Sequence, residues 1–224
     1  MTNKLRVIIT GGTGMIGEGV LYECLHDESV ESVLAVNRRP TGYSHPKLKE
    51  IMLDDFFNLA PIEQQLKGYN ACFFCLGVTS LGKKVEEYTR LTYSLTMSFA
   101  ETLAKLNPGM TFCFISGAGT DSTAQGKSMW ARVKGRTEND LQKIPALKVF
   151  SFRPVAILPT LSLKPGQTYY YTYRYAGWRM PILKFFFPNA VIRLPDLGKA
   201  MIVVAREGFP SSILEARDIN ALGK

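Results

Sequence analysis

The feature that most constrains this chain is a glycine-rich turn between a short apolar run and a helical pattern. Val7-Ile8-Ile9 is followed at once by Thr10-Gly11-Gly12-Thr13-Gly14, and Met15 and Ile16 then begin a helically spaced apolar pattern. Glycines allow a sharp turn and a close approach of the backbone to a ligand, and the helix start supplies free N–H groups at its positive end. This combination predicts a binding site for a dinucleotide pyrophosphate, formed by Gly11, Gly12, Thr13, Gly14, Met15, Ile16 and Gly17. The alternative interpretation is an ordinary turn between a strand and a helix.

Short apolar runs recur along the chain with helical patterns between most of them. Such runs are typical of parallel strands that are covered on both faces. The clearest helical pattern is Val85–Leu106, which Asn107-Pro108-Gly109 ends. The alternation predicts an α/β fold with a doubly wound parallel sheet and right-handed crossovers. The predicted strands are Leu5–Thr10, Ser32–Val36, Glu50–Leu53, Ala71–Leu76, Met110–Ile115 and Lys148–Phe152.

The pattern changes after Arg153-Pro154, where prolines and glycine mark a loop. We therefore expect residues 1–155 to form a dinucleotide-binding domain. Residues 156–224 are then a small C-terminal substrate or lid region packed on the same domain, with a helix near Asp196–Arg206, an apolar run at Ser212–Leu214 and a last short helix.

Composition limits the classes of protein that remain. With 224 residues and 46% apolar residues, the chain is long enough to bury a substantial core. Neither a signal peptide nor a bilayer-spanning apolar run is recognisable, and four cysteines are too few for a disulfide scaffold, so we expect a cytoplasmic protein. Cys72 and Cys75 have Cys-x-x-Cys spacing, but residues three apart in a strand point to opposite faces, which favours core packing over redox or zinc chemistry. His26 and His45 are isolated in the sequence, and no metal site is predicted.

Basic residues follow the second predicted strand, about 20 residues after the last glycine of the turn. An acidic residue at this point would bind the ribose 2′-hydroxyl of NAD, whereas Asn37-Arg38-Arg39 presents two guanidinium groups that suit a 2′-phosphate. The sequence therefore predicts NADP as cofactor. The alternative places both arginines in a solvated loop. Asp55-Phe56 is expected to meet the adenine, and Leu76-Gly77 is expected to let the chain pass close to the cofactor.

Several motifs, taken in order, resemble those of a known family. They are Thr10–Gly17, Asp55-Phe56, Phe74–Thr79, Ile115–Ala118 and Lys134-Gly135 with Glu138. Over roughly residues 5–155 the chain resembles the atypical short-chain dehydrogenase/reductases, and within them the Tat-interacting-protein-like oxidoreductases. The resemblance implies an NAD(P)-binding Rossmann fold with strand order 3-2-1-4-5-6 and a seventh strand. It also implies an NADP-dependent oxidoreductase acting on a small or hydrophobic carbonyl compound.

The resemblance also implies a catalytic group, with one departure from the family pattern. Ser116 stands where the family serine polarises the substrate carbonyl, and Lys134 stands where the family lysine holds the nicotinamide ribose. Trp130 occupies the position of the proton-donating tyrosine, and an indole N–H has no accessible acid–base equilibrium. Proton delivery by Ser128, by a tyrosine of Tyr169–Tyr175 or by water stays open. The rival hypothesis is a non-catalytic NADPH-binding regulator or interaction module.

The segment Tyr169–Phe187 is strongly aromatic and carries only positive charge. Between Leu141 and Pro195 there is no acidic residue, so eight basic residues there account for the net charge of +8. The segment is interpreted as helices that line the substrate cleft, as a peripheral membrane contact or as an oligomer or partner contact. The expected partner is a small-molecule substrate, not a nucleic acid, because the glycine turn indicates a nucleotide cofactor.

Overall fold

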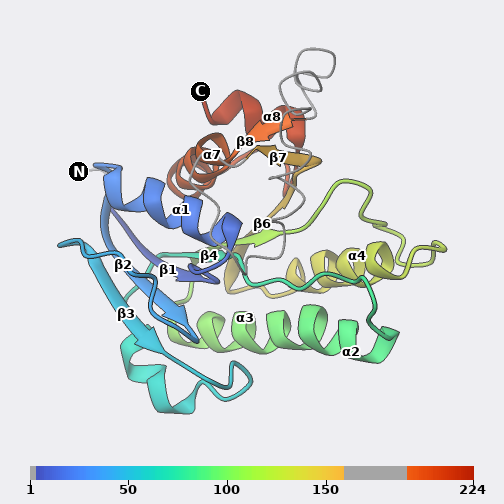
Figure 1. Ribbon diagram of the computed structural model, residues 1–224, viewed down its shortest axis with the longest axis horizontal. Helices are drawn as coiled ribbons and strands as arrows, with labels where there is room; N and C mark the ends of the chain where they lie inside the picture. Colours follow the sequence, from blue (N-terminus) through green and yellow to red (C-terminus); the bar gives the residue numbers. More distant parts are fainter. Residues whose placement is uncertain (1–3, 159–190) are drawn as a thin grey trace.

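A single parallel sheet of seven strands organises the protein. The computed structural model describes residues 4–158 and 191–224, and its sheet has the order β3-β2-β1-β4-β5-β6-β9 (Figure 1). The predicted order 3-2-1-4-5-6 with a seventh strand is therefore confirmed. The strands are β1 (Leu5–Thr10), β2 (Val30–Asn37), β3 (Leu48–Met52), β4 (Ala71–Phe74), β5 (Met110–Ile115), β6 (Leu147–Arg153) and β9 (Ile213–Glu215).

Helices cover both faces of this sheet, as its near-continuously apolar strands require. On one face lie α1 (Met15–His26) and α7 (Leu194–Glu207). On the other lie α3 (Leu95–Leu106), which α2 (Val85–Thr89) and a π-helical turn η2 (Arg90–Ser94) precede, and α4 (Met129–Leu141). The single helix predicted over Val85–Leu106 therefore exists, with a π turn inside it. A 3₁₀ helix, η1 (Ala60–Leu66), and the C-terminal α8 (Ala216–Leu222) complete the described helices.

Two hydrophobic cores lie on the two faces of the sheet. Successive residues of a strand point to opposite faces, so Ile9 and Phe73 pack with α1 and α7, whereas Ile8 and Phe74 pack with α3. The cysteines follow the same rule. Cys72 belongs to the α3 core and Cys75 packs against the α1 core, so the prediction that they point to opposite faces is confirmed.

Two short strands were missed in the sequence. The chain after Pro154 was expected to be a loop, but β7 (Ala156–Leu158) pairs in parallel with β8 (Val191–Arg193) as a separate two-stranded sheet. Three residues are too few for a period-two pattern, and the pairing joins segments more than 30 residues apart. The segment Tyr169–Phe187 lies outside the described residues. Within residues 4–158 and 191–224, no helix is both long enough and apolar enough to span a bilayer.

A buried ion pair connects α4 to the edge of the main sheet. The Arg153 guanidinium, at the end of β6, donates Nε to Glu138 Oε1 at 3.0 Å and Nη2 to Glu138 Oε2 at 2.5 Å. The same guanidinium donates to Ser122 Oγ at 2.7 Å and reaches Glu215 at 3.3 Å. The hydrogen bonds that Arg153 donates to Glu138 raise the pKa of Arg153 above its usual value. The Glu138 side chain is only 2% exposed, so its charge depends on Arg153 for compensation.

Replacing Arg153→Met should leave the Glu138 carboxylate buried without its cation. We expect the free energy of unfolding to fall by about 3–5 kcal/mol, measured by urea titration. The exposed pair Lys83–Glu87 provides the control, because Glu87→Gln should change the same quantity by less than about 1 kcal/mol. A loss of similar size in both variants would contradict this account of the buried pair.

Candidate functional site

The predicted site residues gather at one edge of the sheet. The glycine turn follows β1, Asn37 ends β2, Leu76 and Gly77 follow β4, and Ser116 follows β5. Because all these strands are parallel, their carboxyl ends meet at the same edge, which is where ligands bind in doubly wound sheets.

The glycine turn is closely packed against the rest of this edge. Gly11 has a φ angle of +71°, and a Cβ atom there would lie 2.8 Å from the Cys75 carbonyl oxygen at the end of β4. A Cβ atom on Gly17 would overlap the Gly11 carbonyl oxygen, so both positions require glycine. The turn therefore places the start of α1 directly above the end of β1. The N–H groups of Met15 and Ile16, in the first turn of α1, have no carbonyl one turn earlier to bind.

Asn37 fixes the turn from the neighbouring strand. Its Oδ1 accepts a hydrogen bond of 2.8 Å from the Gly12 N–H, so that amide is not available to a ligand. Asn37 is 2% exposed, and among the described residues its Nδ2 has no hydrogen-bond partner. A buried amide donor without a partner is unfavourable unless a ligand or water pairs with it. The glycine turn and this donor fit a ligand that carries phosphate or ribose oxygens.

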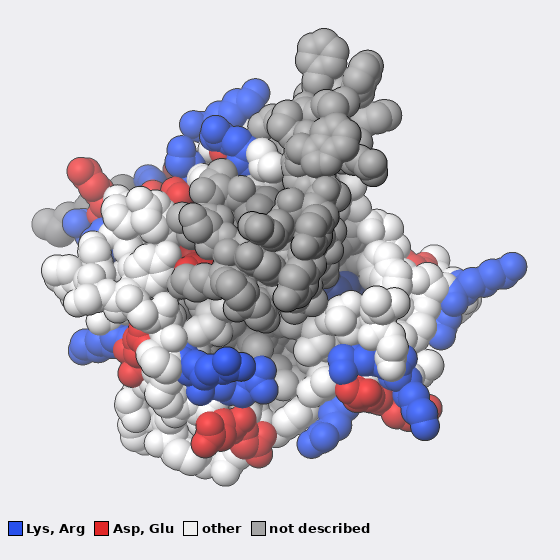
Figure 2. Space-filling model, in the orientation of Figure 1, with Lys and Arg blue, Asp and Glu red and all other residues white. Residues whose placement is uncertain are grey.

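Arg38 and Arg39 lie in a short exposed loop that is anchored at both ends. Asn37 holds the start of the loop through Gly12, and Thr41 holds its end by donating its backbone N–H and its hydroxyl to Glu50 of β3. Both arginines are exposed and available to a solvent-side phosphate. Figure 2 shows that the basic side chains of the displayed face form separate groups, some of them next to acidic side chains.

The residues expected near the adenine and along the cofactor differ in which of their atoms are available to a ligand. Phe56 is buried and stacks on Phe99, with ring centroids 6.3 Å apart, so only its backbone is available to a ligand. Asp55 is exposed and its Oδ1 accepts a hydrogen bond from the Phe57 N–H. Leu76 donates its N–H to Thr10 Oγ1 at 3.4 Å. At Gly77 an added Cβ would meet no atom of residues 4–158 or 191–224 within 4 Å, so these parts of the fold do not require glycine there.

Ser116 is buried at the end of β5 and is hydrogen-bonded to a residue that the sequence did not single out. Its Oγ lies 3.0 Å from Thr120 Oγ1, and the Thr120 hydroxyl donates to the Gly117 carbonyl oxygen at 2.7 Å. A hydroxyl has one hydrogen to donate. Since Thr120 uses its hydrogen on Gly117, Ser116 must donate its own to Thr120, and its free lone pairs are left to accept.

Lys134 extends from α4 to the same strand end. Its Nζ donates to the Ser116 carbonyl oxygen at 2.8 Å and to that of Ile115 at 3.4 Å. Burial lowers the pKa of Lys134 from 10.5 to about 8, and the Glu138 carboxylate one helical turn later opposes the shift. The ammonium has a third N–H that these two carbonyls do not use.

Trp130 lies one turn before Lys134 on α4 and covers the turn that follows β5. A Cβ atom on Gly119 would lie 3.6 Å from the indole Cη2, and one on Gly117 would lie 3.8 Å from Cζ3 and 4.0 Å from Lys134 Nζ. The structure thus brings Ser116, Trp130 and Lys134 together. Ser128, also considered as a proton donor, is the exposed N-cap residue of α4, and its hydroxyl forms no hydrogen bond with the described residues.

Thr120 and the Arg153–Glu138 pair were not predicted as parts of the site. Nothing in the sequence around Thr120 distinguishes it from an ordinary turn residue. Glu138 does carry a signal, because it lies four residues after Lys134 and so occupies the same helix face. The loop between β5 and α4 is also held by Asp121, whose carboxylate accepts N–H groups from Thr123 and Gly126.

The two histidines are not isolated, contrary to the sequence interpretation. The His26 ring stacks on Tyr22, and its centroid lies 5.9 Å from that of His45. The loop before β3 brings the rings together, which their separation of 19 residues does not reveal. Among the described residues, no three metal-ligating side chains form a group.

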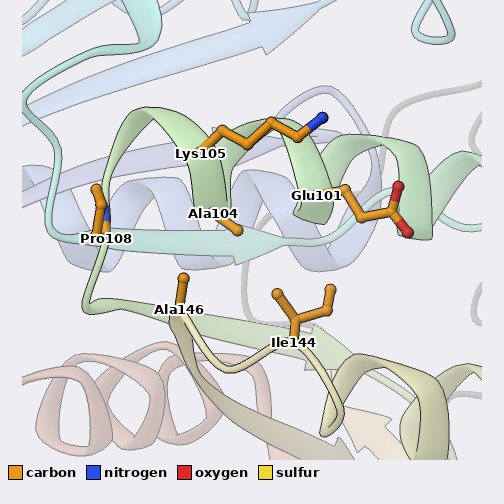
Figure 3. Close-up of a pocket in the computed structure, with 6 residues that line it drawn as sticks. All are labelled: Glu101, Ala104, Lys105, Pro108, Ile144 and Ala146. Carbon is orange, nitrogen blue, oxygen red and sulfur yellow. The ribbon is translucent and has the colours of Figure 1, made fainter.

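An open depression of about 410 Å³ lies elsewhere, at the amino ends of β5 and β6 (Figure 3). Its largely apolar lining comes from the end of α3 and from the segments before β5 and β6, namely Glu101, Ala104, Lys105, Pro108, Ile144 and Ala146. None of the predicted site residues lines it.

Comparisons with known proteins agree with this geometry. No family model matches the chain. Protein HTATIP2 of Rattus norvegicus is 26% identical over 170 residues, which are 75% of this chain and 69% of that protein. The mitochondrial protein FMP52-1 of Scheffersomyces stipitis is 24% identical over 156 residues, covering 69% and 68% of the two chains. The Bordetella bronchiseptica enzyme WbmF, solved with NAD+, superimposes with a TM-score of 0.68 at 14% identity, covering 98% of this chain and 77% of that one.

The fold is therefore a doubly wound Rossmann fold, as in WbmF. The similarity to HTATIP2 confirms the resemblance to the atypical, Tat-interacting-protein-like short-chain dehydrogenase/reductases that the motifs indicated.

The lowered pKa of Lys134 makes a specific contribution to stability. Between about pH 8 and pH 10 the unfolded chain retains a proton on this lysine that the folded protein has released, so raising the pH favours the folded state. Relative to Lys134→Met, the wild-type free energy of unfolding should rise across this window by on the order of 2 kcal/mol. Urea titrations of both proteins at several pH values measure this difference in the free energy of unfolding.

Lys127→Met is the matched control, because Lys127 is exposed and precedes the same helix. The free energy of unfolding of Lys127→Met should change with pH by the same amount as that of the wild type. If the free energy of unfolding of Lys134→Met also changes with pH as in the wild type, Lys134 is not desolvated as described.

Proposed function

We propose that the protein is an NADP-dependent oxidoreductase of the atypical short-chain dehydrogenase/reductase type that acts on a small or hydrophobic carbonyl compound. One observation carries the proposal. A single sheet edge places the glycine turn and the unpaired Asn37 amide beside the Ser116–Lys134 pair at the end of β5.

The chain offers a complete set of cofactor contacts at this edge. The turn Gly11–Gly17 and the first amides of α1 would hold the pyrophosphate, and Asn37 with Arg38 and Arg39 would hold the phosphorylated ribose. Asp55 would meet the adenine, and the open space at Gly77 leaves room beside β4. The bound cofactor supplies a hydride to the carbonyl carbon. A solved protein of this fold holds NAD+, and the two arginines favour NADP here.

The remaining residues would orient the substrate and exclude water. Ser116 would donate to a carbonyl oxygen after its hydroxyl turns from Thr120, which then keeps its bond to Gly117. The Trp130 indole would form an apolar wall over the Gly117–Gly119 turn, and this wall suits a hydrophobic substrate. Lys134 would hold the cofactor ribose, and one of its N–H groups is not used by the carbonyls of Ile115 and Ser116.

Cellular location and partners remain part of the proposal. We propose a cytoplasmic enzyme with a small-molecule substrate, although the similar yeast protein is named as mitochondrial. The segment Tyr169–Phe187 lies outside the described residues. Its contact with a membrane surface or with a second chain stays a prediction.

A second function is favoured by the substitution at the tyrosine position. An indole replaces the phenol, and the Ser116 hydrogen is directed to Thr120, so an NADPH-binding regulator without turnover is the rival. Both functions require NADPH to shift its fluorescence on binding. Only the oxidoreductase consumes NADPH when offered aldehydes, ketones and quinones, and binding without consumption across that panel would favour the rival.

Arg38→Ala with Arg39→Ala should weaken NADPH binding at least about tenfold and change NADH binding little, because only NADPH carries the 2′-phosphate. Isothermal titration calorimetry measures both affinities. Lys49→Ala with Lys105→Ala removes two exposed charges elsewhere and is the matched control for general electrostatic attraction. Equal weakening of NADPH and NADH would refute the assignment of the arginines.

Gly77→Val should reduce NADPH affinity while leaving the thermal midpoint within a few degrees of the wild type. The reason is that a Cβ there meets no atom of the described residues but enters the space proposed for the cofactor. Gly77→Ala is the graded control, because a single methyl group at the same position should reduce the affinity less than the valine side chain does. Unchanged affinity in Gly77→Val would place the cofactor elsewhere.

A further inference from the structure

Among the described residues, no phenol stands at the position where a reductase of this class has its acid. The indole of Trp130 occupies that position, packed over Gly117 and Gly119, and its N–H does not titrate in water. The carbonyl oxygen of a substrate gains negative charge as it is reduced, so some other group must supply a proton.

The serine is already committed as a donor. Thr120 gives its hydrogen to the Gly117 carbonyl, so the Ser116 hydrogen points to Thr120. A serine hydroxyl is also a weak acid, so even when it is released it orients the oxygen without protonating it.

Lys134 has the geometry of a donor. Two of its N–H groups are directed to the carbonyls of Ile115 and Ser116, which hold Nζ at the end of β5 next to the Ser116 side chain. Its third N–H is unused by these bonds. Burial lowers the pKa of Lys134 to about 8, so the ammonium both donates and regains a proton near neutral pH.

The charged and titratable groups around Lys134 determine whether its ammonium can release a proton. Glu138 on α4 favours the charged amine, but this carboxylate is neutralised by Arg153 from β6. Among the described residues, the hydrogen-bond partners of Nζ on β5 and just after it are the carbonyls of Ile115 and Ser116. The elements that contact α4, namely α2, η2 and α3, carry the titratable groups Glu86, Glu87, Tyr88, Arg90, Tyr93, Glu101 and Lys105. Of the described groups, only Glu138 acts on the pKa of Lys134 besides burial.

We propose that Lys134 is the catalytic acid of this protein, taking the role left vacant by Trp130. The inference rests on the proposed function. In the balanced step, the carbonyl carbon would receive a hydride, with its electron pair, from the reduced dinucleotide that the turn Gly11–Gly17 would hold. The C=O π electrons move to oxygen, which takes a proton from Lys134 Nζ. The products are the alcohol, the oxidised dinucleotide and a neutral amine, which solvent protonates again.

Lys134→Arg is the decisive variant. Arginine keeps the positive charge and the N–H donors but does not release its proton. We expect NADPH affinity within about threefold of the wild type, because the charge is kept, and a single-turnover reduction rate lower by about 100-fold or more. Lys127→Arg, an exposed lysine just before the same helix, should change neither quantity, and Ser128→Ala tests the rival hydroxyl.

The pH dependence separates an acid from a structural lysine. The wild-type reduction rate should fall above about pH 8, as the ammonium is lost, and the break should be absent in Lys134→Arg. A measurement that needs no turnover is the NMR titration of protein labelled with ¹³C at the lysine Cε atoms. The Lys134 signal is identified as the one that is absent from the spectrum of Lys134→Arg, and in the wild type it should titrate near pH 8. Reduction by Lys134→Arg at the wild-type rate, or a break that disappears in Ser128→Ala instead, would overturn the proposal.

Different results would refute the proposed oxidoreductase function and the assignment of Lys134 as its acid. A wild type that binds NADPH but reduces no carbonyl compound would refute the oxidoreductase, and the acid with it. A wild type that turns over while Lys134→Arg does so equally well would refute only the assignment of the acid. A Lys134 signal that titrates near pH 10.5 would also refute that assignment.

Discussion

The contact between Gly17 and the Gly11 carbonyl is the constraint on which the proposed site depends. Because neither residue has a side chain, α1 starts directly against the end of β1, and the same turn packs on the Cys75 carbonyl at the end of β4. The turn and the end of the sheet are thus one rigid unit. Asn37 completes it by accepting the Gly12 N–H, and its own Nδ2 is buried without a partner among the described residues.

Helix α4 presents one aromatic and two charged side chains along one face. Trp130 covers the turn after β5, Lys134 binds the strand-end carbonyls, and Glu138 pairs with Arg153 inside the protein. The spacing of four residues makes this alignment a property of the helix. The effect is an ammonium that is desolvated but not neutralised, since the carboxylate nearest to it is already paired.

Many of the strands and helices could be predicted from the sequence because their patterns involve only residues that are close together along the chain. The strand Met110–Ile115 is apolar throughout and was predicted with its observed bounds, and the helix Val85–Leu106 follows from a spacing of three and four residues. The strands β7 and β8 were missed because each has three residues and is defined only by its partner. The proximity of His26 to His45 was missed for a related reason: it results from how a loop returns to the sheet.

The sequence by itself determined the glycine turn, the alternation of strands and helices and the presence of Ser116, Lys134 and Trp130, because these depend on residue type and short-range spacing. Only the tertiary structure decided the state of those groups. The direction of the Ser116 hydrogen depends on Thr120, the unpaired amide depends on how Asn37 meets Gly12, and the lowered pKa of Lys134 depends on its burial beside β5. Each of these properties results from desolvation and hydrogen bonding between separate elements, and the spacing of residues along the chain does not encode them.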